Sequence, residues 1–142
     1  MKISEVVRGK GAAVVTIVPD ASVGELLALL AEHRIGAVVV STDGSSVNGI
    51  VSERDVVRHL HSTGAGILQG PVSAIMTAQV RTASIDSDLD ELESTMTEHR
   101  IRHVPVVIDG QLAAIVSIGD VVKNRIHTLQ AERDQLSAYI SS

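Results

Sequence analysis

The sequence predicts a mixed α/β (α+β) protein in which two β-α-β-β-α repeats pack as a pseudo-two-fold pair, followed by an extended C-terminal helix. Two observations predict this fold: a duplication at a fixed offset, and apolar runs that alternate with helical periodicity within each copy. The chain has 142 residues, of which 44% are hydrophobic and 20% charged. That length supports a buried core, and that composition excludes wholesale disorder.

The duplication has an offset of 66 residues, which is the separation of His33 and His99. The segment AEHRI at 31–35 recurs as TEHRI at 97–101. The same offset relates three further pairs: Thr16 and Thr82, Asp20 and Asp86, and Asp43-Gly44 and Asp109-Gly110. Two copies of so long a unit favour a pseudo-symmetric pair over a solenoid.

In the first copy, a β-branched strand is expected at 14–17, followed by a helix that begins with a capping box at Ser22-x-x-Glu25. Apolar strands at 37–40 and 47–51 flank Asp43-Gly44, and Asp-Gly between apolar runs predicts a hairpin. A second helix is expected to begin near Ser52. Because both hairpin strands are nearly continuous apolar runs, we expect the sheet to be covered on both faces.

The second copy repeats this order, with Asp88-x-x-Glu91 as the equivalent capping box and strands at 103–108 and 111–116. A glycine-containing linker at 61–71 joins the copies, and 71–76 is expected to form a short helical turn. The last helix is expected at about 120–140. One of its faces carries Ile126, Leu129, Leu136 and Ile140, interrupted by Arg133. This face either packs on its own domain or forms a subunit contact.

Composition excludes several classes of function. With one Tyr and no Phe or Trp, the chain has no aromatic platform for stacking bases, and a net charge of −5 without a basic block disfavours DNA. The absence of Cys excludes disulfides, thiol nucleophiles and cysteine metal clusters. No secretory signal or membrane-length apolar run is visible. We therefore expect a cytoplasmic protein without nucleic-acid or membrane partners.

The motif with functional content is Ile-Val-Ser-x-x-Asp, which occurs at 50–55 and at 115–120, where a one-residue deletion in the second copy has reduced the offset to 65. On its own, Ser-x-x-Asp is a helix capping box. Its place between a strand and a helix is also suited to a phosphate or a ribose, since backbone N–H groups and the helix dipole point outward there. An Asp at such a junction can accept two hydrogen bonds from a ribose diol. The residues alone leave both interpretations open.

The order of elements, the paired Thr-x-x-x-Asp segments and the two Ile-Val-Ser-x-x-Asp motifs resemble the tandem cystathionine β-synthase (CBS) domain pair, or Bateman module, in its stand-alone bacterial form. The resemblance covers about residues 10–126. It implies a first repeat with its N-terminal segment at 1–66, a second repeat at 67–127 and a helical extension at 128–142. It also implies a non-catalytic regulatory module that binds adenosine-containing ligands and acts on a partner.

The resemblance places the ligand in two clefts, each completed by both repeats, with Ser and Asp of each motif contacting ribose. The first cleft would contain Ser52, Arg54, Asp55, Val80, Thr82, Arg102 and His103. The second would contain Ser117, Gly119, Asp120, Val14, Thr16, Gly36 and Ala37.

The two clefts differ in charge. Arg54, Arg102 and a protonated His103 would suit a phosphate, whereas the second cleft has small uncharged residues at these places. We therefore expect the Asp55 cleft to bind a phosphorylated ligand more tightly. Ala114 replaces the family's glycine in the second copy, and its methyl group is expected to narrow the Asp120 cleft.

The expected ligand is AMP, ADP, ATP or NAD(H), with S-adenosylmethionine ranked lower, and no cofactor is required for catalysis. A homodimer and an unidentified regulated protein are the expected partners. The alternative is a structural or interaction dimer in which the motifs are only helix caps. A hydrolase that uses Asp and His is the least favoured reading, because no nucleophile–base pair or metal constellation is present.

Overall fold

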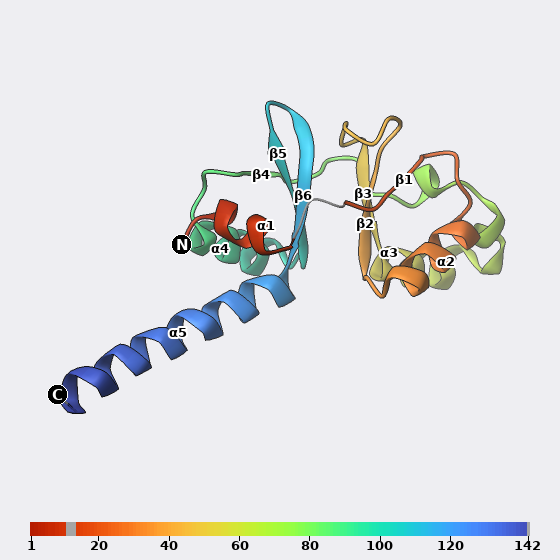
Figure 1. Cartoon of the computed structure of the whole chain (residues 1–142). Helices are drawn as coiled ribbons and strands as arrows, with labels where there is room; N and C mark the ends of the chain where they lie inside the picture. Colours follow the sequence, from red (N-terminus) through yellow and green to blue (C-terminus); the bar gives the residue numbers. More distant parts are fainter. Residues whose placement is uncertain (11–13, 142) are drawn as a thin grey trace.

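A computed structural model describes residues 1–10 and 14–141 of the chain. It has two lobes, each built on a three-stranded sheet (Figure 1). The first sheet contains β1 (Thr16–Ile17), β2 (Ala37–Val40) and β3 (Gly49–Ser52), with β1 parallel and β3 antiparallel to β2. The second contains β4 (Ala83–Ser84), β5 (His103–Ile108) and β6 (Gln111–Ser117) in the same arrangement. The predicted mixed α/β fold with two repeats is confirmed.

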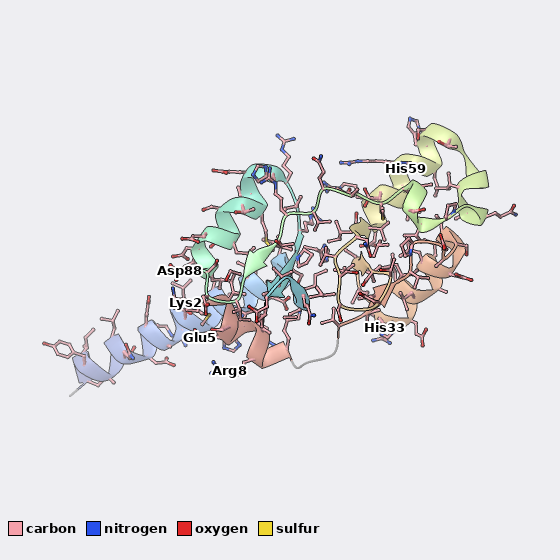
Figure 2. The ribbon with its side chains drawn as sticks, turned by 90° about the horizontal axis from the view of Figure 1, so that it is seen from above. Lys2, Glu5, Arg8, His33, His59 and Asp88 are labelled. Carbon is pink, nitrogen blue, oxygen red and sulfur yellow. The ribbon has the colours of Figure 1, made fainter. Side chains whose placement is uncertain are left out.

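Helices α2 (Val23–His33) and α3 (Glu53–Thr63) belong to the first lobe, and α4 (Leu89–His99) belongs to the second. The capping box of α2 forms as predicted: Glu25 N–H donates to Ser22 Oγ at 3.0 Å, and Ser22 N–H donates to Glu25 Oε2 at 3.1 Å. The expected box at Asp88 is wrong, because this N-cap side chain makes no capping hydrogen bond. The Asp88 carboxylate pairs instead with Lys2 Nζ at 2.9 Å (Figure 2).

Short helical segments cross between the lobes. Helix α1 (Ile3–Lys10) precedes the first repeat but packs on the second core, where Ile3 and Val6 are buried. In return, the 3₁₀ turns Ala65–Gln69 and Val72–Ala74 lie on the first lobe, and Val72 is buried in the first core. The helical turn expected at 71–76 is thus present. The segment that precedes each repeat in the sequence therefore packs on the other lobe, and these contacts connect the two lobes.

The Asp-Gly turns differ between the copies. Asp109 and Gly110 form a two-residue hairpin with φ of 51° and 77°, the left-handed conformations that a type I′ turn requires. Asp43 and Gly44 lie instead in a longer loop between Val40 and Gly49, so the strand expected at 47–51 begins later. Asp43 Oδ1 accepts from the N–H groups of Ser45 and Ser46 at 2.8 and 2.7 Å, which lowers the pKa of Asp43 to about 2. This side-chain turn replaces the tight hairpin.

The C-terminal helix α5 (Ile118–Ser141) begins on the second lobe and then projects away from both lobes (Figure 1). Of its residues, only Val121 is buried, and every residue from 129 to 141 is exposed. The apolar face predicted at Ile126, Leu129, Leu136 and Ile140 is therefore not packed on its own domain. Ser142, the last residue of the expected extension, lies outside the described residues.

Candidate ligand-binding clefts

A cavity of about 920 Å³ lies between the two lobes. The first lobe contributes Ser52, Arg54 and Asp55 to its wall, and the second contributes Val80, Arg102 and His103. Six of the seven residues that the sequence placed in the first cleft therefore line one cavity. The seventh, Thr82, precedes β4, is exposed and does not line it.

Gly36 and Ala37 line this same cavity, although the sequence placed them in the other cleft. The start of β2 lies against the start of β5: a Cβ atom added at Gly36 would lie 3.5 Å from His103 Cε1. Equivalent backbone bonds hold both strand starts, since Glu53 N–H donates to the Gly36 carbonyl at 3.0 Å and Ile118 N–H donates to the Arg102 carbonyl at 2.8 Å. Gly36 and Ala37 therefore lie in the same cavity as Arg102 and His103.

Asp55 combines a structural role with a free acceptor. Its Oδ2 atom accepts from Ser52 N–H at 2.9 Å and from Ser52 Oγ at 3.1 Å, and Asp55 N–H donates to Ser52 Oγ at 3.4 Å. The capping box therefore forms at the start of α3. Within the described part of the chain, no group donates to the other carboxylate oxygen, Oδ1. One oxygen completes the cap and the other is available to a ligand hydroxyl.

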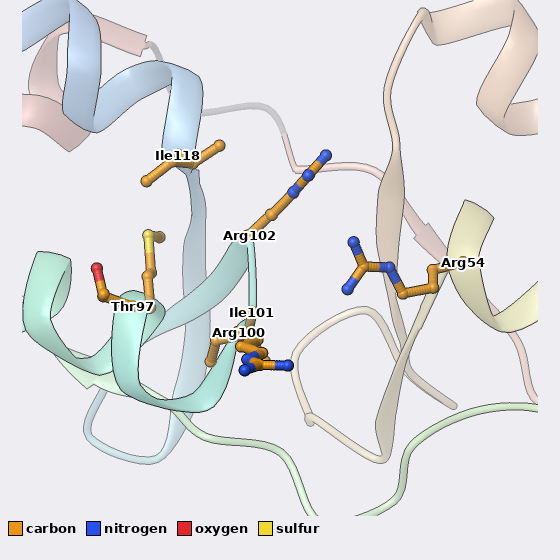
Figure 3. A pocket seen from close by; sticks show the side chains of 7 residues that line it. Arg54, Thr97, Arg100, Ile101, Arg102 and Ile118 are labelled. Atoms are coloured by element: carbon orange, nitrogen blue, oxygen red, sulfur yellow. The ribbon is translucent and has the colours of Figure 1, made fainter.

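Five arginine side chains line the cavity, more than the two expected from the sequence. They are Arg54, Arg58, Arg81, Arg100 and Arg102. Among residues 1–10 and 14–141, none of them forms an ion pair, and the acidic residues of the wall are Glu53 and Asp55. Figure 3 shows Arg54 reaching from the first lobe toward the side of the second that carries Arg102. A smaller hollow of about 450 Å³ beside the cavity shares Arg54, Arg100 and Arg102 with it.

Sequence reasoning missed three of these arginines. The sequence spacing could have predicted Arg58, because it follows Arg54 by four residues on α3 and therefore lies on the same face of that helix. Arg100 ends α4 in a left-handed conformation with φ of 52°, and only the tertiary structure turns it toward the first lobe. Arg81 belongs to the connection before β4, where no periodicity predicts a direction.

His103 is half-buried at the start of β5. Burial lowers the pKa of its imidazole below the usual value, and Lys10 and Arg102 lower it further, against the opposing charges of Glu53 and Asp120. In the ligand-free protein, burial therefore disfavours the protonated form of His103 that the sequence analysis assigned to phosphate binding.

The second Ser-x-x-Asp motif also forms a cap, but its carboxylate already has a cationic partner. Asp120 Oδ2 accepts from Ser117 N–H at 2.8 Å and from Lys10 Nζ at 2.6 Å. Burial alone would raise the pKa of Asp120, yet the bonds from Lys10 and Ser117 outweigh it and the pKa lies below its usual value. No sequence signal pointed to Lys10, which is 110 residues away.

The other residues of the expected second cleft do not line the large cavity: Val14, Thr16, Ser117 and Gly119. Val14 and Thr16 are half-buried before and within β1. Ala114, which the sequence predicts to narrow the Asp120 cleft, is 4% exposed. Its methyl group is buried in the second core, where β6 pairs with β5.

Two kinds of feature are absent from the residues that the structure describes. Outside 11–13 and 142, no group of three or more His, Asp or Glu side chains is placed to hold a metal ion. The same residues form no helix that is both long and apolar enough to cross a bilayer. The Nδ1 atom of His59 lies 2.8 Å from the Asp55 carbonyl of its own helix.

Comparison with known proteins agrees with this architecture. The CBS domain profile matches the chain twice, at residues 6–62 and 72–127. The chain belongs to the CBS-domain family. The mitochondrial CBS domain-containing protein CBSX3 of Arabidopsis thaliana is 32% identical, over 97% of this chain and 71% of that protein.

Solved structures of CBS-domain proteins superpose on the whole pair. The CBS-domain protein ATU1752 of Agrobacterium tumefaciens is 46% identical with a TM-score of 0.85, covering 88% of this chain and 99% of that one. The CBS domain protein PAE2072 of Pyrobaculum aerophilum, whose structure is a complex with AMP, is 28% identical with a TM-score of 0.75. That match covers 84% of this chain and 89% of the other. The tandem CBS pair is thus the architecture of this chain.

Proposed function

We propose that this CBS pair is a non-catalytic regulatory module that binds an adenosine phosphate in the cavity beside Asp55. One observation carries the proposal: five arginines that form no ion pair among the described residues line a single cleft of a chain whose net charge is −5. Unpaired like charges held close together are unfavourable unless a counter-charge joins them. A phosphate chain supplies that charge, and guanidinium groups bind phosphate through paired hydrogen bonds.

The other parts of a nucleotide also find matching groups. The free Oδ1 of Asp55 can accept from a ribose hydroxyl. Ile50, Val57 and Val80 line the cavity and offer an apolar surface for adenine without an aromatic ring. AMP in the related PAE2072 structure supports an adenosine ligand. The five arginines favour ADP, ATP or NAD(H) over AMP and rank S-adenosylmethionine last.

Regulation would follow from where the cationic groups lie. Arg54 and Arg58 belong to α3 of the first lobe, whereas Arg100 and Arg102 belong to the second. A phosphate chain held by both sets bridges the lobes, so it binds more tightly to the arrangement in which the lobes are closest. That differential affinity shifts the population of conformations that a partner protein recognises.

The first experiment is thermal unfolding of the full chain with AMP, ADP, ATP, NAD⁺, NADH and S-adenosylmethionine at millimolar concentration. A ligand at about 100 times its Kd adds roughly 2.7 kcal/mol to the free energy of unfolding. For a chain of this size the midpoint rises by about 5–10 °C. We expect ligands with two or more phosphates to raise it most. A panel without any shift would contradict the proposal.

A matched pair of variants separates binding from capping. Asp55→Ala removes a capping box that lies in the cavity, and Glu25→Ala disrupts one that lies outside it. Both should lower the free energy of unfolding by about 0.5–2 kcal/mol. Only Asp55→Ala should also abolish the ligand-induced shift. Equal ligand shifts in both variants would show that Asp55 is only a cap.

The second candidate function is a structural or interaction dimer without a ligand. Both Ser-x-x-Asp motifs do form capping bonds, at Ser52 and at Ser117, and this observation favours it. Capping does not explain the arginine-lined cavity, because within the described residues none of the five arginine side chains makes a capping hydrogen bond; Arg100 caps α4 through its backbone N–H alone. The ligand panel decides between the two functions.

A further inference from the structure

The projecting part of α5 carries large side chains at alternating spacings of four and three residues. These positions are Val122, Ile126, Leu129, Arg133, Leu136 and Ile140. An alternation of four and three is the heptad pattern of a coiled coil, in which Ile126, Arg133 and Ile140 occupy a positions and Val122, Leu129 and Leu136 occupy d positions. In the part of the chain that the structure describes, the apolar residues of this pattern are exposed.

The stripe faces away from the lobe on which α5 begins. Val121 is 2% exposed and Asn124 and Thr128 are half-buried, so those residues form the side that packs on the second lobe. The exposed fractions of Leu129, Leu136 and Ile140 are 56%, 63% and 80%. Most helical stability in proteins comes from packing an apolar face, and a face left in water adds little to it. The exposed apolar residues of this stripe are therefore suited to a partner.

We propose that this face forms an antiparallel two-stranded coiled coil with α5 of a second copy of the chain. Charge decides the direction. In a parallel pair each a residue meets its own equivalent, which would set Arg133 against the partner's Arg133 inside the seam. An antiparallel pair sets a against d, so Arg133 lies beside the partner's Leu129 and its guanidinium reaches the partner's Glu132.

One register pairs every position of the stripe. With the dyad at residue 131, Val122 meets the partner's Ile140, Ile126 meets the partner's Leu136 and Leu129 meets the partner's Arg133. Each apolar residue then has an apolar or long aliphatic neighbour, and two Arg133–Glu132 pairs form across the dyad. The helix is thus complementary to itself, which points to a second copy as its partner. The seam from 122 to 140 is about 27 Å long.

Cysteine cross-linking tests the direction of pairing, because the natural chain contains no Cys. In the antiparallel register, the Ile126→Cys and Leu136→Cys variants should form disulfides only when they are mixed, since equal positions of the two helices are about 15 Å apart. In a parallel pair, each variant would cross-link with itself. Self-cross-linking of the unmixed variants would overturn the proposal.

Sedimentation velocity from about 1 to about 100 µM tests whether the stripe holds two copies together. The double variant Leu129→Glu/Leu136→Glu places charges on the seam, and the control Ala131→Glu/Ala138→Glu places the same charges on the opposite face of the same helix. We expect the first to lower self-association at least tenfold and the second to leave it unchanged. A wild-type chain that is monomeric throughout, or equal effects of both variants, would overturn the proposal. Retained nucleotide shifts in both variants would show that this outcome is independent of ligand binding.

Discussion

Lys10 Nζ lies 2.6 Å from Asp120 Oδ2 and also donates to the Ile115 carbonyl at 2.6 Å. Helix α1 delivers this ammonium group to the second repeat. The residue at the equivalent position of the second copy, at an offset of 66, is Met76, whose sulfur lies near Gly49 instead of a carboxylate. The two Ser-x-x-Asp motifs therefore differ in more than their neighbouring arginines: both carboxylates accept the capping bonds through Oδ2, but only the Asp120 carboxylate is paired with an ammonium group.

Replacing Lys10 by methionine should make the second motif resemble the first. Lys10→Met removes the cation from Asp120, so a ribose hydroxyl no longer competes with an ammonium group for that carboxylate. We expect calorimetric titration with the ligand selected by the panel to find one site per wild-type chain and a second, weaker site in the variant. The free energy of unfolding should fall by about 1 kcal/mol. Unchanged stoichiometry would contradict this account of the asymmetry.

Arg34 and Arg100 end α2 and α4 with φ of 54° and 52°, a left-handed conformation that glycine adopts without strain. Arg34→Gly and Arg100→Gly should each raise the free energy of unfolding by up to about 1 kcal/mol, as measured by chemical denaturation. Arg100 lines the cavity and Arg34 does not. Only Arg100→Gly should weaken nucleotide binding, by about tenfold. Equal nucleotide affinities in the two variants would show that the phosphate does not contact Arg100.

The lowered pKa of His103 predicts a pH dependence of stability. Because the folded-state pKa is below the unfolded value near 6.5, the unfolded chain takes up the proton first. The free energy of unfolding should therefore fall as the pH drops through about 6.5 toward the folded-state pKa. His103→Gln cannot take up this proton, so it should lose less stability than the wild type between about pH 7.5 and pH 5.5. Parallel pH profiles from urea denaturation would contradict the prediction.

Gly49 and Gly36 should respond differently to an added methyl group. A Cβ atom at Gly49 would lie 2.6 Å from Met76 Sδ and 3.0 Å from the Thr77 carbonyl, which β3 holds through backbone bonds at Ile50. At Gly36 the close neighbour is the end of the flexible Glu53 side chain, at 2.7 Å. Gly49→Ala should therefore cost about 1–3 kcal/mol of unfolding free energy, and Gly36→Ala less than about 1 kcal/mol. Denaturant titration of both variants measures the difference.

Local patterns in the sequence predicted most of the elements. The caps at Ser22 and Ser52 form as expected, because each depends on residues three positions apart in one turn. The prediction of a cap at Asp88 was wrong because the Asp88 carboxylate forms an ion pair with Lys2, which is distant in the chain. The prediction of a tight hairpin at Asp43 was wrong because the Asp43 carboxylate accepts hydrogen bonds from the N–H groups of Ser45 and Ser46, which form a wider turn.

The sequence by itself determined the repeat, the order of strands and helices, and the presence of Ser-x-x-Asp at two strand-to-helix junctions, since these follow from spacing along one segment. Only the tertiary structure decided which residues share a cleft. Arg81 and Arg100 reach the cavity through the packing of one lobe against the other. Lys10 reaches Asp120 because α1 packs on the second repeat, which is not adjacent to it in the sequence. Contacts between segments far apart in the chain depend on how whole apolar faces fit together, and no local pattern encodes that fit.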